Sequence, residues 1–150
     1  MNADCANAKW LTIKGIKGIL CAFVLGVAGC AAMSPGQRYN VTLGGAQEVP
    51  PVSTRASGSA RITVAEDLSV SASVTTSGIV ATAAHIHMAA AGANGPVIVP
   101  FAKSGDAGFS SQPGARLTQA QFEALKRGGL YVNVHSAANP GGEIRAQLVP

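Results

Sequence analysis

Apolar and polar residues alternate along most of the chain beyond residue 37. From Leu68 to Val74 every second residue is apolar and the residues between are serines, and Ala60 to Val64 has the same period. A period of two is typical of strands with one face on a core and the other toward water. Related patterns predict further strands over residues 38–43, 80–88, 97–101, 130–136 and 143–149.

Turn-forming residues separate these predicted strands. Glu66-Asp67 and Asn94-Gly95 each follow an apolar stretch, and Asn-Pro-Gly-Gly occupies residues 139–142. In the last of these, Pro140-Gly141 suits the central positions of a type II turn. Antiparallel hairpins at this spacing predict an all-β fold, namely an antiparallel Greek-key β-sandwich or barrel.

One segment, about 118–128, has a helical pattern instead. Thr118 and Gln121 match a capping box, and a pair of glycines follows the segment. We expect a short helix that docks on the sheet through apolar residues such as Leu125.

The first thirty residues predict an export signal. Three lysines precede an uncharged apolar run over residues 19–27, which is shorter than the roughly 20 residues of a membrane-spanning helix. The run ends in Val27-Ala28-Gly29-Cys30, which resembles a bacterial lipobox, where cleavage leaves a lipid-modified cysteine at the N-terminus. We expect residues 1–29 to be a lipoprotein signal peptide. Ordinary secretory cleavage and an uncleaved signal anchor are the alternatives.

A lipid on Cys30 would make the membrane the first partner of the chain. Residues 30–37, which include Pro35-Gly36, predict a lipidated N-terminus and short tether before a domain at 38–150. Ala31 stands where an aspartate would favour retention at the inner membrane. The expected location is therefore the bacterial cell envelope, at the outer membrane, facing the periplasm or the surface.

Processing changes the charge and the cysteine count. The formal net charge of +4 falls to +2 for residues 30–150, which carry eight basic and six acidic side chains. The basic residues are scattered without interleaved aromatic residues, which argues against a nucleic-acid partner. Cys30 is the last of three cysteines, and a lipidated thiol forms no disulfide. The domain must therefore be stable through its core alone.

The chain's three histidines lie in two predicted strands. His85 and His87 point to the same side of one strand, because strand side chains alternate between faces. His135 lies on the face of its own strand that also carries Tyr131 and Asn133. If the two strands are neighbours, the three imidazoles converge.

Three neutral imidazoles suit Zn(II) or Cu(II), so zinc or copper is the candidate cofactor. A carboxylate from Glu143 or Glu48 would supply a fourth ligand. The alternative is that His85, His87 and His135 bind loop carbonyls or lie on a solvated sheet face.

Glu48 and Arg145 are further polar candidates, with Asn133 on the same sheet face as His135. Glu48 lies before Val-Pro-Pro and is either a ligand carboxylate or, as we prefer, an acceptor that ties this loop to the domain. Arg145 recognises an anionic partner or, as we prefer, pairs with Glu143 or Glu48.

The sequence does not predict an enzyme. A periplasmic β-sandwich rich in histidine invites comparison with copper–zinc superoxide dismutase, but that family uses more histidines, an aspartate and a disulfide. No Ser-His-Asp order, nucleophilic cysteine or carboxylate pair stands out in the predicted domain.

Several of these segments also carry a family resemblance. The motifs occur in the order GGAQEVPP (44–51), HIH (85–87), NGPV (94–97), YVNVHS (131–136) and NPGGEIR (139–145). In this order they resemble the CHRD domain, a module repeated in the animal protein chordin and found singly in many exported bacterial proteins. The resemblance implies a β-sandwich in an extracytoplasmic setting and says little about activity.

The sequence therefore favours a lipid-anchored envelope protein with one CHRD-like domain. Its function is expected to be non-catalytic binding of an unidentified protein or extracellular ligand, through exposed sheet edges and loops. The alternative is a periplasmic copper- or zinc-binding protein that uses the three histidines.

Overall fold

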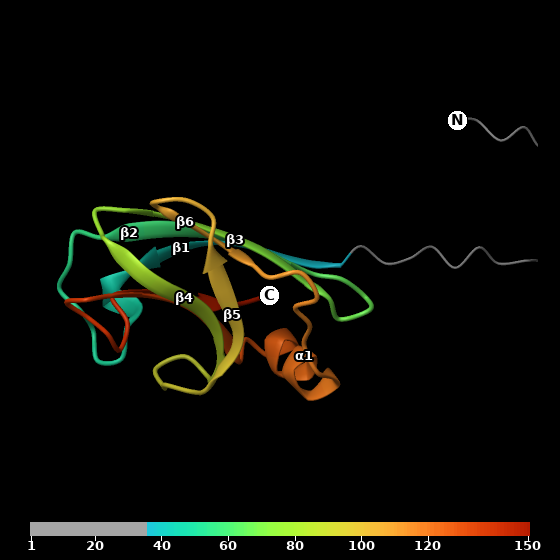
Figure 1. The fold of residues 1–150 in the computed structure, drawn as a ribbon. Coiled ribbons are helices and arrows are strands. Elements are labelled where there is room, and N and C mark those ends of the chain that lie inside the picture. The colour runs from blue at the N-terminus through green and yellow to red at the C-terminus, as the bar shows by residue number, and fades with distance from the viewer. Residues whose placement is uncertain (1–35) are drawn as a thin grey trace, which may run out of the picture. The chain divides into compact units, whose positions relative to one another are not determined.

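Eight antiparallel strands of the computed structural model form one closed barrel (Figure 1). The structure describes residues 36–150, so the predicted signal peptide, Cys30 and most of the tether lie outside the described residues. The strands are β1 (Gln37–Gly44), β2 (Ser57–Val64), β3 (Val70–Ser77), β4 (Ala81–Met88), β5 (Val97–Lys103), β6 (Gly108–Ser111), β7 (Leu130–Ser136) and β8 (Ile144–Leu148). A 3-10 turn, η1 (Gly45–Gln47), follows β1, and the helix α1 (Gln119–Lys126) lies between β6 and β7.

The strand order around the barrel is β1-β2-β3-β6-β5-β4-β7-β8, and β8 meets β1 where Arg145 pairs with Gly44. The strands β4, β5 and β6 are consecutive neighbours, and the connection through α1 returns β7 to the side of β4. This is a Greek-key arrangement. It confirms the predicted all-β fold and resolves the choice between sandwich and barrel in favour of the barrel.

The barrel interior is filled by the apolar series of each strand. On β3 the burial alternates strictly, so Val70, Ala72 and Val74 lie inside and the serines between them are exposed. Val132 and Val134 of β7 are fully buried, as the period of two predicts. Burial of this apolar surface stabilises a domain whose described part contains no cysteine.

The predicted strands match the observed ones within a few residues. The largest differences are of three residues, since β2 begins at Ser57 instead of Ala60 and β3 ends at Ser77 instead of Val74. The strand β3 also begins at Val70, whereas the predicted strand began at Leu68. Leu68 has a left-handed backbone (φ 68°) and belongs to the turn from β2. The sequence missed β6, because this four-residue strand has a single inward apolar residue, Phe109.

The helix begins and ends close to its predicted bounds. The Thr118 side chain accepts a hydrogen bond from the Gln121 backbone, and the Gln121 side chain accepts one from the Thr118 backbone. This confirms the capping box. Leu125 is fully buried against the barrel, as expected. No helix in the described part of the chain is long and apolar enough to cross a membrane.

The predicted type II turn at Pro140-Gly141 is wrong. The backbone of Gly142 does donate to the carbonyl of Asn139, as in a β-turn. A type II turn requires a positive φ at Gly141, whereas the positive φ (137°) lies one residue later, at Gly142. The conformational freedom of glycine is therefore used at the entry to β8.

We predict that Phe109→Ala lowers the free energy of unfolding by about 3–5 kcal/mol, because a buried ring is replaced by a cavity. Phe109 is 1% exposed. Urea titration followed by circular dichroism measures the loss. Val80→Ala is the control, since Val80 is 86% exposed and its change should stay within about 0.5 kcal/mol. Equal effects of the two substitutions would show that β6 does not seal the core.

Candidate metal centre

The strands β4 and β7 are hydrogen-bonded neighbours, which is the condition for the histidines to converge. In their register His85 lies opposite Asn133, and His87 lies opposite Tyr131. His135 lies opposite Ala83 and therefore diagonal to His85. All these side chains lie on the outer face of the barrel, because their strand neighbours fill the interior.

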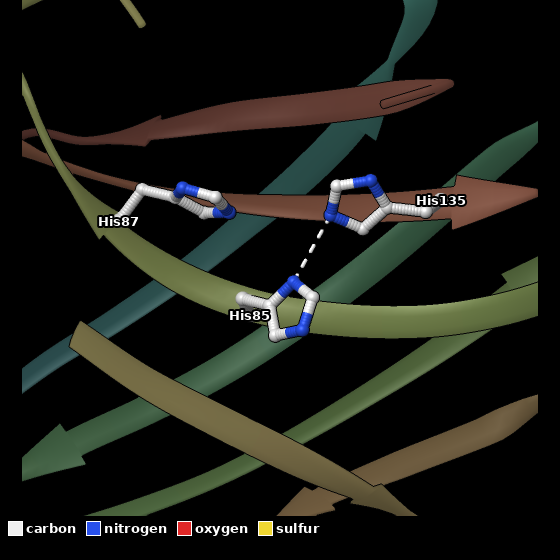
Figure 2. Close-up of side chains that lie close together, drawn as sticks. All are labelled: His85, His87 and His135. Carbon is white, nitrogen blue, oxygen red and sulfur yellow. Dashed lines mark hydrogen bonds between the residues drawn. The ribbon is translucent and has the colours of Figure 1, made fainter. Parts of the chain in front are cut away.

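Figure 2 shows the three imidazoles turned toward one another. His85 Nδ1 and His135 Nε2 are 3.0 Å apart, and one nitrogen from each of the three rings lies within 4.8 Å of the others. The ring centroids of His85 and His87 are 5.6 Å apart, and those of His87 and His135 are 6.1 Å apart. The predicted cluster is therefore present as a geometric unit.

Loop carbonyls orient two of the three rings. His87 Nδ1 is 2.9 Å from the carbonyl oxygen of Gly95, and His135 Nδ1 is 2.9 Å from that of Pro140. A carbonyl can only accept, so each Nδ1 carries a proton and donates it. In the neutral rings each Nε2 then holds a lone pair. Hydrogen bonds to loop carbonyls, which the sequence analysis gave as the alternative to metal binding, are therefore present together with the cluster. They orient its rings.

His87 is the innermost member of the cluster. Its Nε2 is buried and has no hydrogen-bond partner, whereas His85 and His135 are half-buried. A buried polar atom without a partner costs about 1–3 kcal/mol. A bound ion that accepts the lone pair of His87 Nε2 would remove this cost.

Burial favours the neutral form of two histidines of the cluster, His85 and His87. Desolvation, followed by the neighbouring His135 and His87, lowers the pKa of His85 from 6.5 to about 4. Desolvation also lowers the pKa of His87. Neutral imidazoles are the form that binds metal ions.

A stack of side chains fixes His87 from the other side. The rings of His87 and Tyr131 are parallel within 10° at 4.8 Å, and the guanidinium carbon of Arg145 lies 3.4 Å from the centroid of the Tyr131 ring. The hydroxyl of Tyr131 accepts a hydrogen bond from the Gly95 backbone, whose carbonyl holds His87. A Cβ at Gly95 would collide with the carbonyl of Met88. Sequence reasoning placed Tyr131 on this face but did not identify Tyr131 or Gly95 as parts of the site.

The polar face of β7 is covered rather than solvated. Tyr131 and Asn133 are each 2% exposed. The loop that follows β1 reaches Asn133 through Glu48. The loop between β4 and β5 reaches Tyr131 through the backbone of Gly95 and binds Arg145 through Asn94. Both faces of β7 are consequently buried, which its alternating sequence does not predict.

Glu48 ties its loop to the barrel, as the preferred interpretation held. Its carboxylate accepts a 2.7 Å hydrogen bond from Asn133 Nδ2, and it also interacts with the backbone of Val49. Burial raises the pKa of Glu48 to about 7, although the nearby Arg145 and these hydrogen bonds act in the opposite direction. A Cβ at Gly142 would lie 2.7 Å from Glu48 Oε1, so this corner requires glycine.

The expected ion pair of Arg145 is wrong. Arg145 is 1% exposed and forms no salt bridge with Glu143 or Glu48 in the described structure. It donates instead to Asn94 Oδ1, the carbonyl of Ala93 and Gln147 Oε1, at 2.9–3.2 Å. The reason is the loop between β4 and β5, whose neutral acceptors on Ala93 and Asn94 lie within hydrogen-bonding distance of the guanidinium.

Glu143 is not grouped with the histidines. Its carboxylate accepts hydrogen bonds from the hydroxyls of Thr54 and Ser136. These hydrogen bonds lower the pKa of Glu143. The group of potential metal ligands among the described residues consists of His85, His87 and His135. The structure therefore does not bring Glu143 into the place expected for a fourth ligand.

Comparison with known proteins gives one result. The family model of the CHRD domain matches residues 39–148, which include every strand of the site. No curated protein and no solved structure matches the chain.

We predict that Glu48→Gln makes the protein more stable at pH 8, by about 1–3 kcal/mol. A carboxyl whose pKa is raised on folding binds more protons in the folded state, so stability falls between about pH 4.5 and 7 and stays lower above that range. A tenfold change in proton binding corresponds to about 1.4 kcal/mol. Glutamine keeps the acceptor for Asn133 and removes the charge.

Thermal or urea unfolding across pH 4–8 measures this difference between wild type and variant. The comparison with wild type is needed because the lowered pKa values of His85 and His87 change stability with the opposite sign as the pH rises. Glu66→Gln, in the exposed turn after β2, is the control and should leave the profile unchanged. Parallel profiles for wild type and Glu48→Gln would contradict the prediction.

Proposed function

Because the chain belongs to the CHRD domain family, we propose that it is a non-catalytic binding module of the bacterial cell envelope, and that its ligand is a zinc or copper ion held by His85, His87 and His135. From the sequence, an unidentified protein or extracellular ligand came first and metal second. The proposal reverses that order. Each strand of the closed barrel has a neighbour on both sides, which leaves few edges for a protein ligand, while the histidines are clustered.

The observation that carries the proposal is the arrangement around His87 Nε2. This atom is buried without a hydrogen-bond partner, and it belongs to a group of three ligand atoms within 4.8 Å of one another. A metal ion bound among the three nitrogens would satisfy the lone pair of His87. It would also replace the hydrogen bond that His85 Nδ1 donates to His135 Nε2, with the proton of His85 moved to its Nε2 so that Nδ1 has a lone pair for the metal.

The donor set supports a borderline transition metal. Imidazole nitrogens suit zinc and copper, and affinity for divalent ions rises through the first row to Cu(II). The hydrogen bonds from His87 to Gly95 and from His135 to Pro140 are of the kind that orient ligating histidines. Oxygen-seeking ions such as Mg²⁺ and Ca²⁺ have no carboxylate in this group.

The envelope location rests on the N-terminal motif. Val27-Ala28-Gly29-Cys30 resembles a lipobox, and we propose that a lipid on Cys30 anchors the chain in the outer membrane. The domain would then lie next to a membrane surface, facing the periplasm or the exterior. No nucleic-acid partner is proposed, because the basic residues are scattered.

We predict that the full chain, purified without chelators, binds one zinc or copper ion, and that His87→Ala/His135→Ala lowers its affinity more than about 100-fold. Loss of a metal ligand should cost more than the 10- to 100-fold that follows from loss of a residue hydrogen-bonded to a ligand. Elemental analysis and competition with a chromophoric chelator measure stoichiometry and affinity. The cysteines are alkylated in every sample, so that thiols do not bind metal.

Two further variants make this test specific. Glu143→Gln should leave the affinity within about twofold, because Glu143 hydrogen-bonds with Thr54 and Ser136 instead. His135→Gln keeps a polar side chain at a half-buried position and should still fold while it loses affinity. Circular dichroism checks folding in each case. Unchanged affinity in the folded histidine variants would refute the proposed function.

For the anchor, we predict that Cys30→Ala abolishes incorporation of radiolabelled palmitate in a bacterial host and that globomycin blocks processing of the wild type. Lipidation requires the thiol of the cysteine at the cleavage site. Cys21→Ala, within the apolar part of the signal peptide, is the matched control and should still be labelled. Labelling that persists in Cys30→Ala would exclude this residue as the attachment site.

A further inference from the structure

We propose that the metal centre keeps an open fourth coordination position, which accepts a small anion from solvent, such as hydroxide or azide. This inference rests on the proposed function. It adds a second binding event at the same site, with the metal ion as the receptor and a monodentate anion as the ligand.

The protein supplies three donor atoms to the metal centre, one fewer than a four-coordinate ion needs. Among the described residues the group that can hold a metal contains three histidines and no carboxylate or thiol. The two acids expected as fourth ligands have other partners. Glu143 accepts hydrogen bonds from Thr54 and Ser136, and Glu48 accepts one from Asn133. Neither belongs to the group of ligand atoms that lie within 4.8 Å of one another, so neither is placed to bind the metal.

The aromatic neighbour does not complete the set either. The hydroxyl of Tyr131 lies 3.2 Å from the backbone nitrogen of Gly95 and accepts a hydrogen bond from it. The ring of Tyr131 is stacked on His87 at 4.8 Å between centroids, and its hydroxyl, which lies in the plane of the ring, contacts the Gly95 backbone and is not in the group of potential metal ligands. Tyr131 therefore orients a ligand without being one.

The directions of the donors leave one side of the cluster open. The Nδ1 atoms of His87 and His135 are bound to carbonyls, so their Nε2 atoms face inward, and His85 contributes the Nδ1 that lies 3.0 Å from His135 (Figure 2). His87 is buried, whereas His85 and His135 are half-buried. The three nitrogens thus approach a metal from the protein side, and the remaining position faces the accessible side.

The chemistry of the two candidate metals then requires a further ligand. Zinc with three protein ligands takes water or substrate as its fourth, and Cu(II) in nitrogen sites prefers tetragonal coordination. A metal ion also favours an anion at the vacant position, because the three imidazoles are neutral and do not offset its charge. The stack of His87, Tyr131 and Arg145 closes the inner side, so a further ligand must approach from the accessible side.

Azide binding to the Cu(II)-loaded full chain tests this inference. The protein is loaded with one equivalent of Cu(II), desalted, and titrated with sodium azide at constant ionic strength, with sodium perchlorate as the control salt. We expect a new azide-to-copper absorption band and an altered electron paramagnetic resonance spectrum, both saturating at one azide per copper. After a second desalting step the chain should still hold one copper.

The possible results separate this inference from the proposed function. If copper is retained and its spectra do not respond to azide, a protein group closes the fourth position and the inference is overturned, while metal binding stands. If the wild-type chain retains no copper or zinc, the proposed function itself is overturned. If azide removes copper from the chain, the anion replaces a histidine and the open position is disproved.

Discussion

The hydrogen-bonded register between β4 and β7 determines which side chains meet at the histidine cluster on the outer face of the barrel. It places His85 and His87 opposite Asn133 and Tyr131 and brings His135 to a diagonal position. A slip of one residue would turn either set of side chains into the core. The register is held from inside by the apolar residues of both strands, so the packing of the core and the geometry of the site are one constraint.

The second level of organisation is a buried polar layer between the barrel wall and two loops. Arg145 is its centre, because its guanidinium binds the loop between β4 and β5 and lies over the ring of Tyr131. That loop in turn supplies the carbonyl of Gly95 to His87. A single buried cation therefore connects loop position, aromatic stacking and the orientation of a histidine.

Much of this could be predicted from the sequence, and the failures have physical causes. Alternation along β3, β4 and β7 located the strands and the faces of the three histidines, because one face of each strand must be apolar. Alternation says nothing about what covers the polar face, so the burial of Tyr131 and the real partners of Arg145 were missed. Glu143 was misplaced for a related reason. Its strand face was predictable, but the hydroxyls of Thr54 and Ser136 that bind its carboxylate come from other segments.

The separation of the histidines along the chain means that a bound ion would link distant segments of the domain. His85 and His135 are 50 residues apart, and they meet because β7 returns to the side of β4 after the connection through α1. An ion bound by both would bridge two distant parts of the Greek key in a domain whose described residues include no cysteine. Such a bridge joins segments that are distant along the chain, as a disulfide does, but it forms only in the folded state, so its binding free energy adds to that of folding. The occupied centre would be a removable cross-link, whose presence is set by the metal content of the surroundings rather than by their redox state.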